Sequence, residues 1–208
     1  MSALVLFVAV ALSLLLTGAP ALAQKVGKGS CVDTDACLSN TGHVGHNACV
    51  GVDACRSNTG HIKSGACFGV ESCLLNTGAV GNDACQGLDA CFSNTGDIKS
   101  GACVGLGACN LNQGTTIGQG ACGGIDACDQ NTGAIGHNAC LGLNACVLNT
   151  GDIKNNACVG VDACNQNTGA VGSGACIGVS ACQNNSGNIG SGQCIGDGVC
   201  QNNTADIP

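Results

Sequence analysis

Aliphatic residues recur along the chain with a period of 18 residues, and their surroundings predict short strands. One column runs through ten repeats with polar residues on both sides of its members, as in Asp97-Ile98-Lys99 and Asp152-Ile153-Lys154. This alternation is typical of a strand whose aliphatic side chain points inward while its neighbours face water. Glycines interrupt any helical spacing of apolar residues, so helix is disfavoured. The column consists of Val44, Ile62, Val80, Ile98, Ile117, Ile135, Ile153, Val171, Ile189 and Ile207.

The cysteines follow the same period. Their intervals alternate between 6 and 12 residues, except between Cys109 and Cys122, where one residue is inserted within 114–117. The repeat reads A-C-x-G-[VLI]-[DEN]-A-C-x-x-N-T-G-x-[IV]-x-x-x. Short strands stacked at this period predict an all-β fold, a β-solenoid (β-helix) of ten 18-residue coils whose handedness stays open. The cysteines are Cys31, Cys37, Cys49, Cys55, Cys67, Cys73, Cys85, Cys91, Cys103, Cys109, Cys122, Cys128, Cys140, Cys146, Cys158, Cys164, Cys176, Cys182, Cys194 and Cys200.

Three further columns have roles at turns. An asparagine recurs in every repeat, from Asn40 to Asn203, and predicts an internal ladder in which each amide bonds the coils above and below. The glycine two residues later, from Gly42 to Gly187, predicts a corner with positive φ. A second glycine column, which includes Gly51, predicts another corner.

Two disulfide pairings fit a stack of such coils. Cys49 can bond Cys55 within a coil, or Cys67 in the next coil, because stacked residues lie about 4.8 Å apart. We favour the pairing within the coil, which makes one rung per coil and contributes about 2 kcal/mol for each rung. A second aliphatic column is then expected on one side of the rung, with Ile and Asn on the other. It comprises Val52, Val70, Leu88, Leu106, Ile125, Leu143, Val161 and Val179.

The N-terminal segment predicts secretion. Residues 1–23 are typical of a signal peptide: the segment from Ala3 to Leu16 is almost entirely apolar, and Ala21-Leu22-Ala23 has the small-residue pattern of a signal peptidase site, so cleavage is expected before Gln24. Residues 24–30 then make a short lead-in, and residues 31–208 make one ten-coil domain. No later segment is apolar enough for a membrane span after signal cleavage. We therefore expect a secreted, extracellular protein, where disulfides are stable.

Composition narrows the classes of function. Twenty cysteines accompany only four histidines and no C-x-x-C pair occurs, which favours disulfides over zinc. With 35 glycines, no Trp and no Tyr, the chain lacks the large side chains of an ordinary core. The net charge of −7 and the scarcity of aromatic residues argue against nucleic-acid binding. No Ser, His and Asp recur as a set and no phosphate loop opens a helix, so we expect neither an enzyme nor a cofactor.

With these columns in view, the chain resembles two groups of proteins over residues 31–204. One C-x5-C pair per coil among small residues resembles the disulfide-bonded β-solenoid antifreeze proteins of beetles, although those coils are shorter and carry a Thr-x-Thr strand that this chain lacks. The motif NTGxIGxxACxGxxAC resembles uncharacterised secreted cysteine-rich repeat proteins of diatoms and other algae. The resemblance to the beetle proteins implies ice binding as an alternative function. Hexapeptide left-handed β-helices also have 18 residues per coil; residues 135–146 follow their pattern, whereas residues 147–152 follow it poorly.

The ice-binding alternative depends on one column of threonines. Its threonines are regular enough to order water if they face outward on a flat sheet, but Gln113 interrupts them and no second Thr column lies beside them. A threonine at a corner that bonds the local backbone is the interpretation we prefer. The candidate ice-binding residues are Thr41, Thr59, Thr77, Thr95, Thr132, Thr150 and Thr168.

The remaining candidates are metal and glycan sites. Stacked carboxylates such as Asp53, Glu71 and Asp89 repel one another, and Ca²⁺ between coils would relieve that repulsion. One carboxylate per coil is nevertheless a thin ligand set, and a capped turn in water explains the column without an ion. Asn184 and Asn202 begin N-glycosylation sequons.

These patterns favour a structural role. We expect a secreted scaffold, of an adhesive or cell-wall type, that presents a repetitive surface to extracellular matrix, cell wall or another surface. Ice binding is the alternative, and a calcium-binding extracellular repeat protein is a more remote one. The end coils carry Thr34 and Asp197 where an aliphatic residue is usual, which we interpret as the polar substitutions of capping coils, since exposed edges invite polymerisation. End-to-end self-association is a further partner hypothesis.

Overall fold

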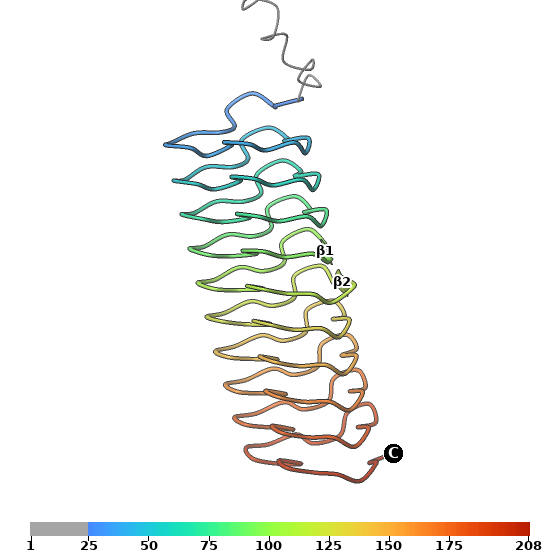
Figure 1. Ribbon diagram of the computed structural model, residues 1–208. Coiled ribbons are helices and arrows are strands. Elements are labelled where there is room, and N and C mark those ends of the chain that lie inside the picture. The colour runs from blue at the N-terminus through green and yellow to red at the C-terminus, as the bar shows by residue number, and fades with distance from the viewer. Residues whose placement is uncertain (1–24) are drawn as a thin grey trace, which may run out of the picture.

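The computed structural model describes residues 25–208, and the predicted signal peptide lies outside them. The described chain winds into a stack of similar coils (Figure 1). Parallel bridges join residues 18 apart in successive coils, for example Val44 to Ile62 and Ile62 to Val80. Residues 25–30 stack on the first coil, where Val26 bridges Val44. No residue of 25–208 is helical, which confirms the exclusion of helix, and the 18-residue repeat is confirmed as the unit of the stack.

Extended structure is short in every coil. Residues 25–208 contain two strands longer than a single bridge, β1 (Asp97–Ile98) and β2 (Thr116–Ile117). These pair in parallel with Ile98 opposite Ile117. Elsewhere single bridges mark the same column and a second one that begins at Val32. The inserted residue is Thr115: Thr116 pairs with Asp97, so the columns on both sides of the insertion stay in register.

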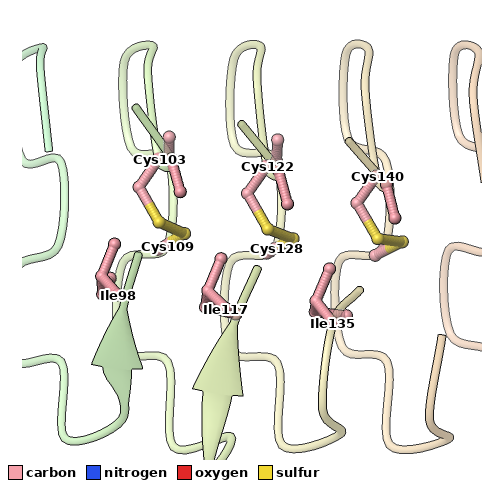
Figure 2. Close-up of a cluster of buried hydrophobic side chains, with 14 of the residues drawn as sticks. Ile98, Cys103, Cys109, Ile117, Cys122, Cys128, Ile135 and Cys140 are labelled. Atoms are coloured by element: carbon pink, nitrogen blue, oxygen red, sulfur yellow. A yellow bond between two sulfur atoms is a disulfide. The ribbon is translucent and has the colours of Figure 1, made fainter. Parts of the chain in front are cut away.

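The interior is narrow and is filled by small side chains. The first aliphatic column, the cysteines and two alanine columns, which include Ala48 and Ala54, are buried in most coils. Figure 2 shows Ile98, Ile117 and Ile135 lying beside the disulfides, one beside each rung. Where Ser72 replaces an alanine, its buried hydroxyl donates to the carbonyl oxygen of Cys85 at 2.6 Å, so the polar group is satisfied.

Each disulfide lies within one coil, which is the pairing that the sequence favours. The bonded cysteines have Cα atoms 5.4–5.7 Å apart, within the range that a disulfide requires. No described cysteine is free. The bonds are Cys31–Cys37, Cys49–Cys55, Cys67–Cys73, Cys85–Cys91, Cys103–Cys109, Cys122–Cys128, Cys140–Cys146, Cys158–Cys164, Cys176–Cys182 and Cys194–Cys200.

The predicted asparagine ladder is confirmed. The Nδ2 of Asn58 donates to Asn40 Oδ1 at 2.7 Å and to the carbonyl oxygen of Gly60 at 2.8 Å. The side-chain link recurs between every pair of neighbouring coils up to Asn203, at 2.7–3.0 Å. A buried amide is costly unless it is bonded, so this ladder fixes the register of the coils from inside.

From the Gly51 column to the asparagine ladder, the chain runs through overlapping turns. In residues 69–76, Ser72, Leu74 and Asn76 each donate a backbone N–H to the carbonyl three residues earlier. The third residue of each turn has a φ of 56–60°, as type II turns require. Residues with positive φ therefore alternate with ordinary ones here, and this alternation explains why so little of a coil is strand.

The two glycine columns differ from each other. The Gly51 column lies at a turn, which confirms the second predicted corner, and its φ of 129–147° is positive. The column from Gly42 to Gly187 does not have positive φ, and that prediction is wrong. Its glycines are needed for close packing instead: a Cβ at Gly60 would overlap the carbonyl oxygen of Gly78 in the next coil.

The second aliphatic column is exposed, which corrects its expected place beside the rung. Its eight side chains, from Val52 to Val179, are 38–49% exposed. Alanines take the interior positions next to the disulfide, and the turn that begins at Gly51 turns Val52 outward. Thr34 and Asp197 stand in this exposed column of the first and last coils, so they replace surface residues and not core residues.

Candidate functional site: an exposed apolar strip

Two apolar columns run side by side along one edge of the coil stack, separated by one glycine of the Gly51 column. The second, from Val52 to Val179, is exposed throughout. The first, which holds the residue after the first cysteine of each coil, is exposed in four coils and partly exposed in the others, as at Val50. Gln86 and Gly123 are the two polar or small interruptions of the first column. We name the sixteen apolar members the apolar strip: Val32, Val50, Phe68, Val104, Leu141, Val159, Ile177 and Ile195, with Val52, Val70, Leu88, Leu106, Ile125, Leu143, Val161 and Val179.

The strip is large for a protein of this size. Phe68 is 54% exposed and Ile195 is 62% exposed. With roughly 60 Å² left on each of the sixteen side chains, the strip exposes about 1,000 Å² of apolar surface. The largest apolar patch of an ordinary monomer is about 300–600 Å², and larger patches mark interaction sites. The strip is therefore the feature of the surface that most needs a partner.

A partly buried acidic column flanks the strip. Asp53, Glu71 and Asp89 all have φ of 56°, a left-handed conformation that Asp, Asn and Gly tolerate better than other residues. In the same column stand Gly107 and Asn144, which fit that backbone requirement without any ligand. The acid column therefore follows from the turn geometry.

The structure gives the calcium hypothesis no cluster of ligands. Within residues 25–208, the only groups of three His, Cys, Asp or Glu close enough to share an ion are cysteines, such as Cys109, Cys122 and Cys128. These sulfurs are already bonded in disulfides and are not thiolate ligands. Asp53, Glu71 and Asp89 lie one to a coil, and Asp53 faces Arg56 at 3.6 Å.

One carboxylate near the turns has an unusual pKa. Burial raises the pKa of Asp129, and the negative charge of Asp126 raises it further, against a lowering effect of the hydrogen bond from Gln130. The Oδ1 atom of Asp129 is buried and has no hydrogen-bond partner. The same is true of the Oδ1 atoms of Asn110 and Asn165 in the same column. Asp129 is thus a locally unfavourable place for a charge.

The threonine column lies on another face, next to the first aliphatic column. Thr59, Thr77 and Thr95 are exposed, and so are the other candidates. No threonine hydroxyl among the described residues takes part in a hydrogen bond, so the expected bond from a corner threonine to the backbone is wrong. Gln113 interrupts this column on the surface and Thr115 adds a residue beside it.

The other predicted polar sites are exposed. His43 and His61 stack with ring centroids 5.0 Å apart and an interplanar angle of 11°. Asn184 and Asn202, the candidate glycosylation sites, lie in neighbouring coils, and Nδ2 of Asn184 donates to Oδ1 of Asn202 at 3.1 Å. The two amides are therefore too close for both to carry a glycan without a local rearrangement.

Comparison with known proteins identifies the repeat. A family described as a domain of unknown function (DUF7640) matches residues 65–176 and residues 144–207. Together the two matches cover well over half of the chain. The chain belongs to this family. No curated protein matches the chain, and no solved structure matches it.

Most of the apolar strip lies inside the part that matches DUF7640. Only Val32, Val50 and Val52 of the strip fall outside residues 65–207. Residues 25–208 contain no helix long and apolar enough to cross a membrane. The family match names neither beetle antifreeze proteins nor algal repeat proteins, so those resemblances stay expectations.

Sequence reasoning misses the strip, although a signal for it exists. The aliphatic character of Val52 suggests burial, but Val52 directly follows the recurring glycine of the Gly51 column, and a glycine is typical of a turn, which lies at the surface. This glycine is the signal for the strip, because aliphatic side chains occur on surfaces as well.

Proposed function

We propose that the protein is a secreted structural scaffold of an adhesive or cell-wall type, a β-solenoid rod that contacts its surroundings through the apolar strip. The observation that carries this proposal is the strip itself, which keeps about 1,000 Å² of apolar surface outside on a molecule held together by disulfides and an asparagine ladder. A repetitive apolar surface on a stiff rod suits an extended contact with another surface.

Secretion is supported by the cysteines and by the predicted signal peptide. Twenty cysteines in ten disulfides are typical of an oxidising compartment, because reductants in the cytosol keep thiols reduced. The apolar segment before Gln24 gives a route to that compartment. An extracellular scaffold needs durability, which the disulfide in each coil supplies.

Localisation in the source cells tests this proposal. Antibodies raised against the purified, oxidised protein are applied to cell sections and to fractions of medium, wall or matrix, and soluble cell contents. We expect the label in the extracellular matrix or wall, in a fraction that detergent or salt releases. Label confined to the soluble cell contents would overturn the proposal, and so would protein found only free in the medium.

Ice binding is the second candidate, because the exposed threonine hydroxyls are free of protein hydrogen bonds. Affinity for a crystal lattice grows with the area of an unbroken matching face. Gln113 and Thr115 interrupt this face near the middle of the rod. We expect weak or absent thermal hysteresis. Strong hysteresis that a bulky residue at Thr77, Thr95 or Thr132 abolishes without unfolding would favour ice binding over the scaffold.

A further inference from the structure

We propose that the occupant of the apolar strip is a second copy of this chain, so that two rods pair side by side with their axes parallel. The inference rests on the proposed scaffold function and names the first partner of the strip. A pair that buries both strips would carry its remaining faces outward, where the threonine column and the charged residues stay free for other contacts.

The area of the strip is sufficient for a stable pair. A specific protein–protein interface of standard size buries about 800 Å² on each partner. The strip exposes about 1,000 Å² of apolar surface, and its members run from Val32 to Ile195 along the rod. The two columns hold one charged side chain, Asp197 in the last coil, so charge is absent from the middle of the strip, as at the centre of interfaces.

The repeat favours a copy of the chain over an unrelated partner. Side chains of one column stand about 4.8 Å apart in successive coils, apart from the interruptions at Gln86 and Gly123. A rigid partner meets them over many coils only if its own side chains have the same spacing. A second copy has this spacing by construction, so contacts made at one coil repeat at the next, and a two-fold axis uses the same patch on both copies.

The acidic column selects the orientation. Asp53 follows Val52 directly, so the acidic column borders the strip on one side only. A two-fold axis along the rods places the Val52 column of each copy over the Val50 column of the other and leaves the two acidic columns at opposite rims. A two-fold axis across the rods would set the acidic columns face to face, where like charges repel.

The experiment compares two matched triple variants of the purified, oxidised protein by sedimentation equilibrium. The first, Leu88→Asp, Leu106→Asp and Leu143→Asp, charges the strip; Asp197 already occupies that column, so the coil accepts the residue. The control, Leu75→Asp, Leu111→Asp and Leu148→Asp, changes three leucines of similar exposure in another column. Circular dichroism and a thiol assay check that both variants are folded and oxidised.

We expect a dimeric wild type, an unchanged control and a strip variant whose dimer dissociation constant is at least 100-fold higher. A wild type that is monomeric at about 100 µM, or a strip variant that dimerises like the control, would refute the pairing. A control that weakens as much as the strip variant would refute the assignment of the interface to the strip.

The salt dependence of the dimer dissociation constant tests the orientation of the two copies. The parallel pair keeps its acidic columns apart, so its dissociation constant should change less than about threefold between 50 mM and 500 mM NaCl. A dimer that tightens tenfold or more with salt would overturn the parallel arrangement.

Localisation distinguishes a failure of the pairing from a failure of the proposed function. A monomeric protein found in the wall or matrix would refute the pairing and support the scaffold function. A dimer found only inside cells would support the pairing and refute the scaffold function.

Discussion

Left-handed backbone at ordinary residues is the most unusual feature of single positions in this chain. Leu75, Leu111 and Leu148 have φ of 52–58°, in a column that also holds serine, glutamine and asparagine. Such a conformation costs about 1–2 kcal/mol for a residue with a Cβ. The type II turns that begin at the second cysteine of each coil hold these residues there, so the tertiary structure and not local preference determines their conformation.

The first residue-scale prediction concerns the inward aliphatic column. Ile98 is 2% exposed and lies between exposed Asp97 and Lys99. Ile98→Asp should lower the free energy of unfolding by about 3 kcal/mol or more, because it buries an unpaired charge. Lys99→Ala should change it by a few tenths, and Asp97→Ala, which loses one exposed hydrogen bond to Ala79, by less than about 1 kcal/mol. Urea melts measure all three, and equal effects would contradict the assignment of Ile98 to the interior.

The second concerns Asp129 and pH. Burial raises its pKa in the folded protein, so the folded state holds the proton more tightly than the unfolded chain. The stability linked to this group is therefore present below the unfolded pKa, about 3.9, and is lost as pH rises through the folded pKa. Asp129→Asn should unfold at higher urea concentration than wild type at pH 7 and at nearly the same concentration at pH 3. A loss of stability at pH 7 would contradict the unfavourable burial of this charge.

At this scale the sequence predicts side chains better than backbone. The buried column of Ile98, the asparagine ladder and the corner at Gly51 follow from alternation, recurrence and glycine chemistry. The left-handed cysteines do not, because a cysteine has no preference for positive φ and is held there by its bond and turn. The role of Gly60 escapes prediction for a related reason: close approach of another coil and positive φ both select glycine, and the sequence alone does not distinguish them.

At the scale of the coil, the backbone of one turn packs directly on the backbone of the next. The glycines from Gly42 to Gly187 lie at this contact, and the asparagine ladder runs beside it. Sequence reasoning finds both columns but not their joint role, which is to let two coils approach closely enough for the amide bonds. The glycines of this column are therefore as important for the shape of the coil as its apolar side chains.

The element-scale prediction compares two glycines. A Cβ at Gly133 would overlap the carbonyl oxygen of Gly151, a backbone atom that has little room to move. Gly133→Ala should therefore lower the free energy of unfolding by about 3 kcal/mol or more. Gly174 has φ of 65° and open space where the methyl group of an alanine would lie, so Gly174→Ala should cost only about 1 kcal/mol. Denaturant melts compare the pair, and a milder effect at Gly133 would contradict the close approach of the coils.

At the scale of the molecule, stability comes from many equal contributions. Apart from the exposed Phe68 and the half-buried Phe92, the described chain has no Phe, Tyr or Trp side chain, and its interior is built from alanine, cysteine, β-branched residues and the asparagine ladder. Such an interior buries little apolar surface per residue. Each disulfide closes a short loop and adds about 2 kcal/mol, so ten of them outweigh the net stability of an ordinary domain.

Reduction is the test at this scale. Full reduction with dithiothreitol should abolish the folded circular dichroism spectrum at 25 °C, whereas the oxidised protein should keep it well above that temperature. Peptide mapping of the oxidised protein should recover pairs six residues apart, such as Cys49–Cys55. A reduced protein that keeps its spectrum and its resistance to protease would show that the coils hold without their bonds.

Because each disulfide closes inside its own coil, the length of the array is free to vary. Removal of residues 67–84 would delete one coil together with both halves of its bond, and no cysteine elsewhere would lose its partner. Duplication of the same segment would add one self-sufficient unit. A lineage that carries this repeat can therefore lengthen or shorten its rods in 18-residue steps by recombination, and the oxidative folding of the other coils is left unchanged.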